Sequence, residues 1–252
     1  MSAEATPLDV IEGRAQWCVV CGERDEVLAS LGDAAVDVTI TDPPYNERTH
    51  KGAKARGGKL ERDTTVRFAE LDGFAWWTES LRLTKRWALA FCAPEQLGCY
   101  ETHAGASWVR SGVWVRIGAS PQFTGDRPAA GADTIGIAHR AGRKRWNGGG
   151  KAAVWSYGFE RGEVGAARLH ETQKPLRLMR ELVRLFSEPG EVILDPHAGS
   201  GTTGVAALLE GRRVILVERD PERAAKALAR MEATQPGEGS RKAKQLALGG
   251  VR

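Results

Sequence analysis

The sequence has few of the features that mark membrane, secreted or disulfide-stabilised proteins. No stretch approaches the run of about 18 apolar residues that a membrane-spanning helix needs, so we expect no membrane contact. The first ten residues contain Glu4 and Asp9 and show no charged-then-apolar signal pattern. Four cysteines are too few for a disulfide framework. These absences together predict a reduced, cytoplasmic protein.

The cysteines also give little support to a metal site. Cys18 and Cys21 have the CxxC spacing of many zinc sites, but Cys92 and Cys99 do not form a second close pair. Segment 17–21 instead has the composition of a buried strand in which the thiols act as small apolar groups. We therefore predict no metal.

Composition and charge are those of a globular protein. The 252 residues are 42% hydrophobic and 27% charged, which excludes wholesale disorder. This length suits a single domain, 1–252, either undivided or with an insertion. Lys and Arg outnumber Asp and Glu by 36 to 32, and the net charge of +4 permits a nucleic-acid partner without proving one. Where the excess is clustered therefore matters more than its size.

Short apolar runs alternate with helical patterns along the chain. The runs are nearly continuous, as expected for strands covered on both faces. They predict strands at 17–21, 36–41, 87–92, 113–117, 192–194 and 214–217. Helices are predicted at 175–187, with Pro175 at the first helical position, at 203–210 and from 221 onward. This alternation predicts an α/β fold with a mostly parallel sheet.

Three stretches depart from the alternation. Segment 48–62 holds six Lys or Arg residues and one acid, and is interpreted as a mobile basic loop. Segment 120–165 is rich in Gly, Arg and Trp without helical periodicity, and is interpreted as an irregular insertion. Segment 234–252 is expected to be a loose tail.

The strongest single feature is a strand, a glycine-rich turn and a helix at 191–204. Gly199, Gly201 and Gly204 fit the G-x-G-x-x-G pattern, and Glu218 ends the next strand 19 residues after the first glycine. Glycines let a backbone approach a ligand, and the carboxylate accepts from ribose hydroxyls. The pattern predicts an adenosine-containing cofactor, with a nicotinamide dinucleotide as the first candidate. A P-loop is excluded because no Lys follows the last glycine.

The position of this loop late in the chain indicates that the other strands of the sheet lie in the first half of the chain. Only 34 residues follow Glu218, so the remaining strands must come from upstream. Ligand sites of parallel sheets gather at the carboxyl ends of the strands. The predicted strand 36–41 leads directly into Asp42-Pro43-Pro44-Tyr45. A carboxylate, a carbonyl and an aromatic ring, held by two stiff prolines, are the groups needed to grip a planar amino-bearing base.

The segments DPPY at 42–45 and DPHAGSGTTG at 195–204 resemble those of the DNA amino-methyltransferases that use S-adenosylmethionine. Their order along the chain is similar to the β-type permutation of that family, and the resemblance covers about residues 17–97 and 166–232. It implies a Rossmann-like methyltransferase fold with circularly permuted motifs and a target-recognition region at about 120–165.

The resemblance also implies a cofactor site. Segment 170–175 is similar to the family segment that encloses the methionine end of the cofactor, and Glu218 would hold the ribose. Glu23 stands where the family has Asp near the adenine, and His197 replaces a small or apolar residue as a wall of the pocket. The implied cofactor-binding residues are Glu23, Asp42, Thr172, Gln173, Lys174, Pro175, Asp195, Pro196, His197, Ala198, Gly199, Ser200, Gly201, Thr202, Thr203 and Glu218.

The implied reaction is direct methyl transfer to the exocyclic amino nitrogen of a flipped base, with no metal and no covalent enzyme intermediate. The catalytic residues are then Asp42, Pro43, Pro44 and Tyr45, with Asp42 and the Pro43 carbonyl as acceptors and Tyr45 stacking. Asp at the first position, followed by Asn46, looks more like the adenine enzymes, since the cytosine-amino enzymes more often have Ser there. Adenine in DNA is favoured, and cytosine N4 methylation is the alternative.

Two basic segments are candidates for contact with double-stranded DNA. Segment 139–151 has five Lys or Arg residues, no acid and a Trp, and 48–62 follows the DPPY turn. Both are expected to flank the turn that holds the base. The candidate DNA-binding residues are Arg48, Lys51, Lys54, Arg56, Arg140, Arg143, Lys144, Arg145, Trp146 and Lys151.

The expected protein is thus a site-specific DNA methyltransferase associated with the nucleoid, and a homodimer is compatible with this function. A restriction-modification role is compatible with this function, but the sequence names no restriction partner. Two other classes stay open: a nicotinamide-dependent oxidoreductase, which would use the same glycine loop, and an inactive DNA-binding module, which would keep only the basic segments.

Overall fold

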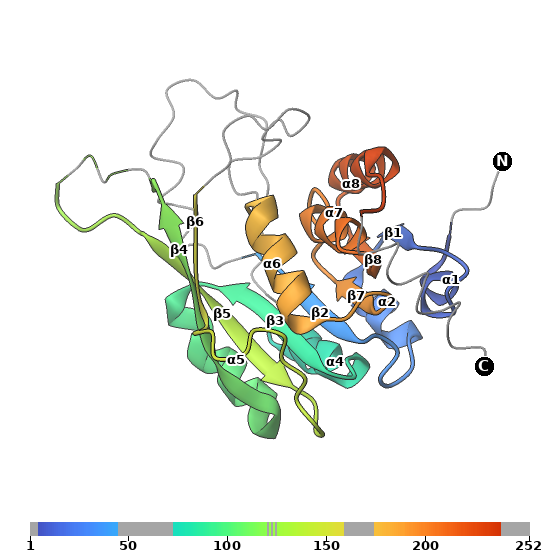
Figure 1. The fold of residues 1–252 in the computed structure, drawn as a ribbon, viewed down its shortest axis with the longest axis horizontal. Coiled ribbons are helices and arrows are strands. Elements are labelled where there is room, and N and C mark those ends of the chain that lie inside the picture. The colour runs from blue at the N-terminus through green and yellow to red at the C-terminus, as the bar shows by residue number, and fades with distance from the viewer. Residues whose placement is uncertain are drawn as a thin grey trace.

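A computed structural model describes residues 5–44, 73–119, 121, 123, 125–158 and 174–237, which form one eight-stranded sheet with helices on both faces (Figure 1). The spatial order of the strands is β1-β8-β7-β2-β3-β5-β4-β6. Their bounds are β1 Trp17–Cys21, β2 Val38–Thr41, β3 Trp87–Cys92, β4 Trp108–Ile117, β5 Ala132–His139, β6 Val154–Gly158, β7 Val192–Asp195 and β8 Arg213–Glu218.

The sheet is mostly parallel, as the sequence predicts. β1, β8, β7, β2 and β3 pair in parallel, and β6 pairs in parallel with β4. β5 runs antiparallel to both of its neighbours, β3 and β4. The carboxyl ends of β2, β7 and β8 therefore meet at one edge of the sheet, where ligands of parallel sheets bind.

Two helical layers cover the sheet. Residues of α6, α7 and α8 pack on one face, and residues of α1, α2, α4 and α5 pack on the other. The bounds are α1 Pro7–Ile11, α2 Arg24–Ser30, α4 Ala75–Leu83, α5 Leu97–Ala104, α6 Leu176–Phe186, α7 Thr202–Leu209 and α8 Pro221–Ala233, with short 3₁₀ turns at Pro94–Gln96 and Gly105–Ser107.

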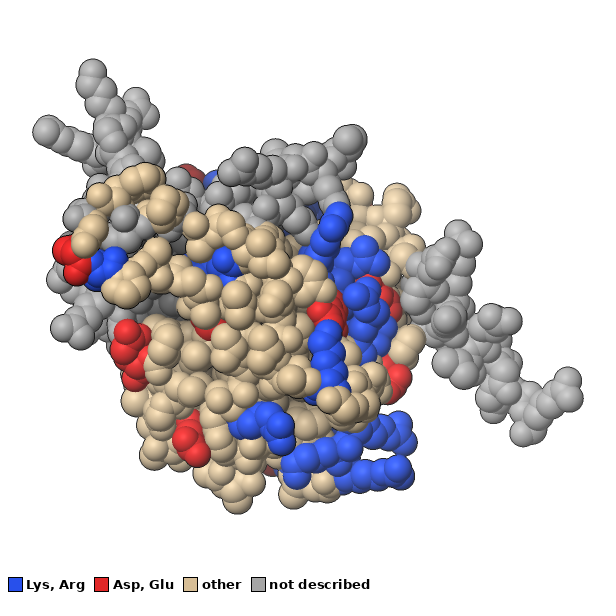
Figure 2. Space-filling model, turned by 60° about the vertical axis from the view of Figure 1, so that its left-hand side comes forward, with Lys and Arg blue, Asp and Glu red and all other residues tan. Residues whose placement is uncertain are grey.

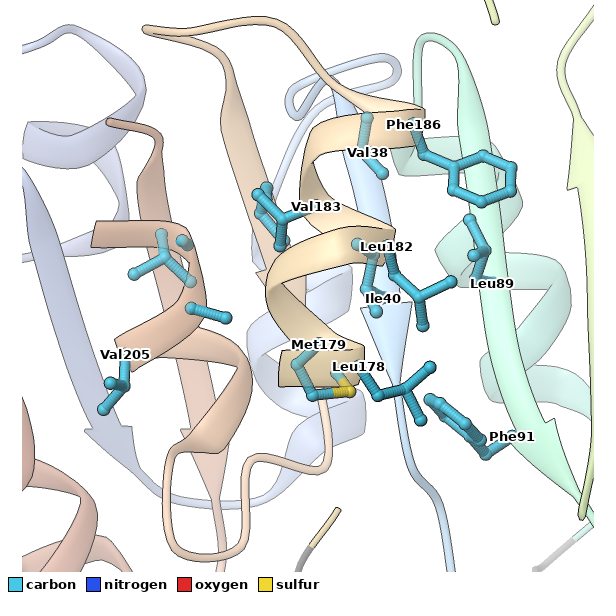
Figure 3. Close-up of a cluster of buried hydrophobic side chains, with 14 of the residues drawn as sticks. Val38, Ile40, Leu89, Phe91, Leu178, Met179, Leu182, Val183, Phe186 and Val205 are labelled. Atoms are coloured by element: carbon cyan, nitrogen blue, oxygen red, sulfur yellow. The ribbon is translucent and has the colours of Figure 1, made fainter. Parts of the chain in front are cut away.

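Strand β3 shows why its apolar run is continuous. Side chains alternate across a strand, so Leu89 and Phe91 face α6 while Ala88 and Ala90 face α4 and α5. All six residues of β3 are buried. Figure 3 shows the first of these faces, where an apolar stripe of α6 packs on β2 and β3. The stripe consists of Leu178, Met179, Leu182, Val183 and Phe186.

Most predicted elements are confirmed, with two corrections. Segment 120–165 is not irregular throughout, because 132–139 and 154–158 form β5 and β6. Pro175 precedes the first turn of α6 as its N-cap rather than occupying the first helical position. The predicted loop 48–62 lies outside the described residues, as does the tail beyond residue 237.

The CxxC segment forms β1, as predicted, but its two thiols differ. Cys18 is buried, and burial raises the pKa of its thiol to about 12. Cys21 is exposed at the end of the strand, so the expectation that both thiols are buried is wrong for Cys21. In the part of the chain that the structure describes, no helix has both the length and the apolar character to cross a membrane.

The contact between α7 and its neighbours depends on a missing side chain. A Cβ atom on Gly204 would lie 2.6 Å from Leu216 Cδ1 of β8 and 2.6 Å from Met231 Sδ of α8. No real Cβ tolerates such distances, so any side chain here must push α7 away from the sheet or displace both neighbours.

We therefore expect Gly204→Val to lower the free energy of unfolding by about 1–3 kcal/mol, the usual cost of overpacking. Gly98→Val is the matched control, because a Cβ on this helical glycine of α5 meets nothing within 4 Å. The control is expected to stay within about 0.5 kcal/mol of the unmodified protein. Urea unfolding followed by circular dichroism measures both, and equal effects would contradict the packing described.

Candidate active site

Acidic side chains end three neighbouring strands at the carboxyl edge of the sheet. Glu218 ends β8, Asp195 ends β7, and Asp42 follows the last residue of β2. Because these strands are adjacent in the order β8-β7-β2, the three carboxylates lie along one edge. The two motifs, about 150 residues apart in sequence, are brought together as predicted.

Asp195 is the most buried of these acids, with 2% of its surface exposed. One carboxylate oxygen, Oδ1, accepts from the Thr41 hydroxyl at 2.8 Å and from the His197 backbone N–H at 3.1 Å. Burial raises the pKa of Asp195 to about 6, against the opposing effect of these hydrogen bonds and of one from Thr203. The buried carboxyl therefore titrates much closer to neutral pH than an ordinary Asp.

His197 has a defined tautomer. Arg24 Nη1, which can only donate, lies 2.8 Å from His197 Nε2, so that nitrogen is the acceptor. The proton is then on Nδ1, which lies 3.0 Å from the Thr41 hydroxyl oxygen. Burial and the neighbouring Arg24 and Arg219 hold the pKa of His197 well below its usual range. The ring is thus neutral, and its role as a wall of the cofactor pocket stays a prediction.

The glycine loop presents its backbone to the edge of the sheet. Gly199 and Gly201 both have positive φ angles, and Gly201 caps the N-terminus of α7. Glu218 is fixed beside the loop, since Oε2 accepts from the Gly199 N–H at 2.8 Å and Oε1 from the Asp220 N–H at 3.0 Å. Glu23, the other predicted adenosine contact, lies exposed at the N-cap of α2, directly after β1.

Arg230 of α8 forms hydrogen bonds to the glycine loop, and the sequence did not predict this role. Its Nη1 donates to the Ser200 carbonyl at 2.6 Å and to the hydroxyls of Ser200 and Thr202 at 3.1 Å each. Burial lowers the pKa of Arg230. Thr202 and Thr203 are themselves buried, and Thr203 hydrogen-bonds to Asp195, so these hydroxyls stabilise the loop from inside. The only sequence signal was the place of Arg230 on the helix following Glu218.

The Asp42 turn is in contact with Lys174. Pro43 is buried and Asp42 is partly exposed at the edge of the sheet. Lys174 Nζ lies 2.7 Å from Oδ1 and 2.8 Å from Oδ2 of Asp42. The resemblance implied a cofactor contact for Lys174, whereas the structure brings it to the predicted catalytic carboxylate. Pro175, its neighbour, is buried at the start of α6.

An aromatic group that the sequence analysis did not assign lies behind the site. The Trp76 ring of α4 contacts the His197 ring edge to face at 4.6 Å, and Arg24 lies over the same Trp76 ring at 5.8 Å. Tyr100 of α5 packs against Trp76 and Trp77. These rings lie on helices that the strand pattern did not predict.

Several predicted residues lie outside the described part of the chain. These are Tyr45, Thr172, Gln173, Arg48, Lys51, Lys54 and Arg56. Their predicted roles in base stacking, cofactor binding and DNA contact stay predictions.

The second basic segment, 139–151, begins at the end of the sheet opposite the candidate site, where the parallel strand β3 starts. β5 runs antiparallel to β3, so His139 pairs with Trp87 at the start of β3, while the site is beyond its end. A strand of six residues spans about 20 Å. The prediction that this segment flanks the Asp42 turn is therefore wrong.

Side chains of this segment divide into two groups. Three have structural contacts, since Arg140 Nη1 donates to the Arg82 carbonyl, Trp146 packs edge to face on Phe186, and Lys151 pairs with Glu181. Trp146 is only partly exposed and packs against the core, which does not suit stacking on a base. The other three candidates, Arg143, Lys144 and Arg145, are exposed.

This edge of the sheet carries groups that fit the adenosine part of S-adenosylmethionine. Glu218, held by two backbone amides, is placed to accept from ribose hydroxyls, and a Cβ on Gly199 would meet nothing within 4 Å, so the loop is open there. Asp195, at the end of the neighbouring strand, adds a carboxyl group to this edge, and the Asp42 carboxylate beyond it is paired with Lys174. The residues present therefore fit an adenosine cofactor.

Comparison with known proteins finds similarity to DNA methyltransferases. A family model described as DNA methylase matches residues 113–229. The type II methyltransferase M.HinfI of Haemophilus influenzae is 25% identical over 231 residues, covering 80% of this chain and 64% of that protein. The DNA adenine methyltransferase YhdJ of Escherichia coli K12 is 37% identical over 79 residues, covering 31% and 27%. The chain spans less than two thirds of the length of either relative.

Solved structures share the fold. The M1.HpyAVI–SAM complex superposes with a TM-score of 0.64 at 21% identity, covering 85% of this chain and 98% of that one. The PvuII DNA methyltransferase, described as cytosine-N4-specific, gives 0.65 at 15% identity, covering 92% and 91%. The predicted Rossmann-like methyltransferase fold and the resemblance on which it rests are confirmed.

The raised pKa of Asp195 leads to a pH-dependent stability. The carboxyl titrates near 3.8 in the unfolded chain and near 6 in the native protein, so its stabilising contribution is complete below the first value. That contribution is lost as the pH rises through about 6. Relative to Asp195→Asn, which does not titrate, the free energy of unfolding of the unmodified protein should fall by on the order of 2 kcal/mol between about pH 4 and pH 7. Urea titrations at both pH values measure this difference, and a difference independent of pH would contradict it.

Proposed function

We propose that this chain, whose sequence and fold are those of the S-adenosylmethionine-dependent DNA amino-methyltransferases, methylates the exocyclic amino group of adenine in DNA. The observation that carries the proposal is the placement of the Asp42-Pro43-Pro44 turn beside the glycine loop. Parallel pairing of β2 with β7 puts the Asp42 carboxylate and the Pro43 carbonyl next to the end of β7 that leads into the glycine loop. A nitrogen held at the turn could then meet a methyl group held at the loop.

The residues of the edge have separate binding roles in this proposal. Glu218 accepts from the ribose, and the open backbone at Gly199 admits the cofactor. Asp195 and the neutral His197 ring line the edge between Glu218 and Asp42. When bound, S-adenosylmethionine supplies an electrophilic methyl group on a positively charged sulfur.

Asp42 and Pro43 prepare the amino nitrogen for attack. An aromatic amine is a poor nucleophile, because its lone pair is delocalised into the ring. Hydrogen bonds from its two hydrogens to the Asp42 carboxylate and the Pro43 carbonyl favour a pyramidal nitrogen with a localised lone pair. That pair forms the new nitrogen–carbon bond as the carbon–sulfur bond breaks with its electrons on sulfur. The nitrogen then loses one proton.

Adenine is favoured over cytosine as the base. The chain has Asp42 at the position where the cytosine-amino enzymes more often have Ser, and one of its relatives is a DNA adenine methyltransferase. A solved structure of similar fold is described as cytosine-N4-specific, so cytosine N4 methylation is the alternative. The two products differ in mass and in nucleoside, so one measurement separates them.

Incubation with DNA and methyl-labelled S-adenosylmethionine, followed by digestion to nucleosides and mass spectrometry, should give N6-methyldeoxyadenosine. We expect Asp42→Ala to abolish labelling because the amino group loses its charged acceptor, while calorimetry shows cofactor binding nearly unchanged. Labelling that persists in this variant would exclude Asp42 as the base-gripping residue. Methylcytidine as the product would establish the alternative, and reduction of a nicotinamide nucleotide without labelling would favour an oxidoreductase.

We also propose a path for the DNA along the flank formed by α6. This helix begins beside Asp42, through Lys174, and ends at Phe186, which packs on Trp87 at the opposite edge of the sheet. The loop bearing Arg143, Lys144 and Arg145 is attached to that end, since Asn147 Nδ2 donates to the Arg184 carbonyl at 3.0 Å.

The flank is predominantly basic. α6 contributes Arg177, Arg180 and Arg184, of which the last two pair with Glu210. Figure 2 shows Lys and Arg side chains gathered on the right and lower parts of one face of the molecule. A duplex lying on this flank would contact the site and the exposed loop together, which a duplex confined to the carboxyl edge could not do. The phosphates of DNA are the partner that such a row of cations suits.

Replacing Arg143, Lys144 and Arg145 together by Ala should weaken DNA binding and reduce the slope of log affinity against log salt by about 2–3. Fluorescence anisotropy over a range of salt concentrations measures the slope. The matched control is Lys226→Ala, an exposed position of α8 away from this flank. An unchanged slope in the triple variant would show that DNA does not reach this loop.

A further inference from the structure

Lys174 has a contact that its predicted role as a cofactor residue does not explain. Its ammonium lies 2.7 and 2.8 Å from the two carboxylate oxygens of Asp42. A charge-assisted contact to both oxygens holds a carboxylate in position, with both of its oxygens directed toward the ammonium. The side chain comes from the residue just before Pro175, so the start of α6 determines where the ammonium lies.

The surroundings of Lys174 restrict where the ammonium can move. The side chain is 9% exposed, and the ammonium lies 4.9 Å from the centre of the Phe91 ring and 5.8 Å from that of Trp114. A second carboxylate, Asp133 of β5, lies 4.0 Å away and is itself paired with Arg116 at 3.3 Å. Aromatic faces and two carboxylates thus hold one cation in place.

We propose that Lys174 is a positioning residue for Asp42: it holds the carboxylate ionised and oriented so that Asp42 accepts a hydrogen bond from the amino group of the base. This inference rests on the proposed function, because it assigns Lys174 a part in the same reaction. A carboxylate has about four acceptor sites, of which an ammonium in contact with both oxygens takes two.

The charge of Lys174 also decides what Asp42 does not do. A neighbouring cation favours the ionised carboxylate and makes it a weaker base. Asp42 therefore orients the amino group and stabilises the positive charge that develops on nitrogen, without removing its proton. The nitrogen loses that proton to water after the new carbon–nitrogen bond has formed.

Lys174→Met tests the inference, because Met keeps an apolar stem against Phe91 and Trp114 while removing the charge. We expect kcat for DNA methylation to fall roughly 10- to 100-fold, the range for losing a hydrogen bond to a charged group. The dissociation constant for S-adenosylmethionine, from calorimetry, should change less than about threefold. Lys174→Arg keeps the charge and should recover part of kcat, and Lys226→Met controls for removal of an exposed lysine.

The pH profile and a double variant separate positioning from mere stability. Without the ammonium, Asp42 takes up a proton at higher pH, so the acid limb of the kcat profile should move to higher pH in Lys174→Met. In an Asp42→Asn background, measured by single turnovers, Lys174→Met should have little further effect. Additive losses, an unmoved acid limb, or a more than tenfold weaker cofactor affinity with kcat unchanged would overturn the proposal.

A readout without catalysis keeps this inference distinct from the proposed function. The carboxyl ¹³C resonance of Asp42, assigned by its loss in Asp42→Asn, should titrate at higher pH in Lys174→Met than in the unmodified protein. If the unmodified protein labels no DNA, the proposed function fails, while this titration still reports whether Lys174 controls the ionisation of Asp42. Identical titrations would overturn the pairing itself.

Discussion

The parallel pairing of β2 with β7 is the constraint on which the candidate site depends. The Asp42 turn follows β2 and the glycine loop follows β7, and pairing of Thr39 with Leu194 places the ends of these two strands side by side. The hydrogen bond from the Thr41 hydroxyl to Asp195 then joins the end of β2, before the Asp42 turn, to the end of β7, before the glycine loop. A shift of β2 by one residue would turn Thr41 to the other face of the sheet and break this connection.

Burial of charge follows from the same arrangement. Three carboxylates at neighbouring strand ends would repel one another, and each is offset differently. Glu218 accepts from two backbone amides, Asp195 from Thr41 and the His197 amide, and Asp42 from the ammonium of Lys174. Asp195 is almost fully buried and is offset by neutral donors alone, and burial raises its pKa to about 6. Neutral hydrogen bonds therefore do not fully compensate the burial of this charge.

The sequence predicts what is local and misses what depends on long-range packing. The glycine loop, the strand before it and the Asp42 turn are recognisable because their chemistry lies in consecutive residues. Arg230 and Lys174 act on residues that are distant in sequence, and Trp76 lies on a helix whose apolar face was not predicted. The basic run 139–151 was misplaced for a related reason. Its distance from the site follows from the reversed direction of β5, which no local pattern reveals.

Helix α6 links the Asp42 turn to the basic flank. Lys174, just before the N-cap Pro175, contacts the Asp42 carboxylate, and the apolar stripe of the helix packs on β2 and β3. Its arginines face outward along the basic flank, and its C-terminal end holds the loop of exposed cations through Asn147. A displacement of α6 along its axis would therefore change the position of Lys174 and of the basic flank together. One packed helix therefore carries both the residue that contacts Asp42 and the residues of the proposed DNA path.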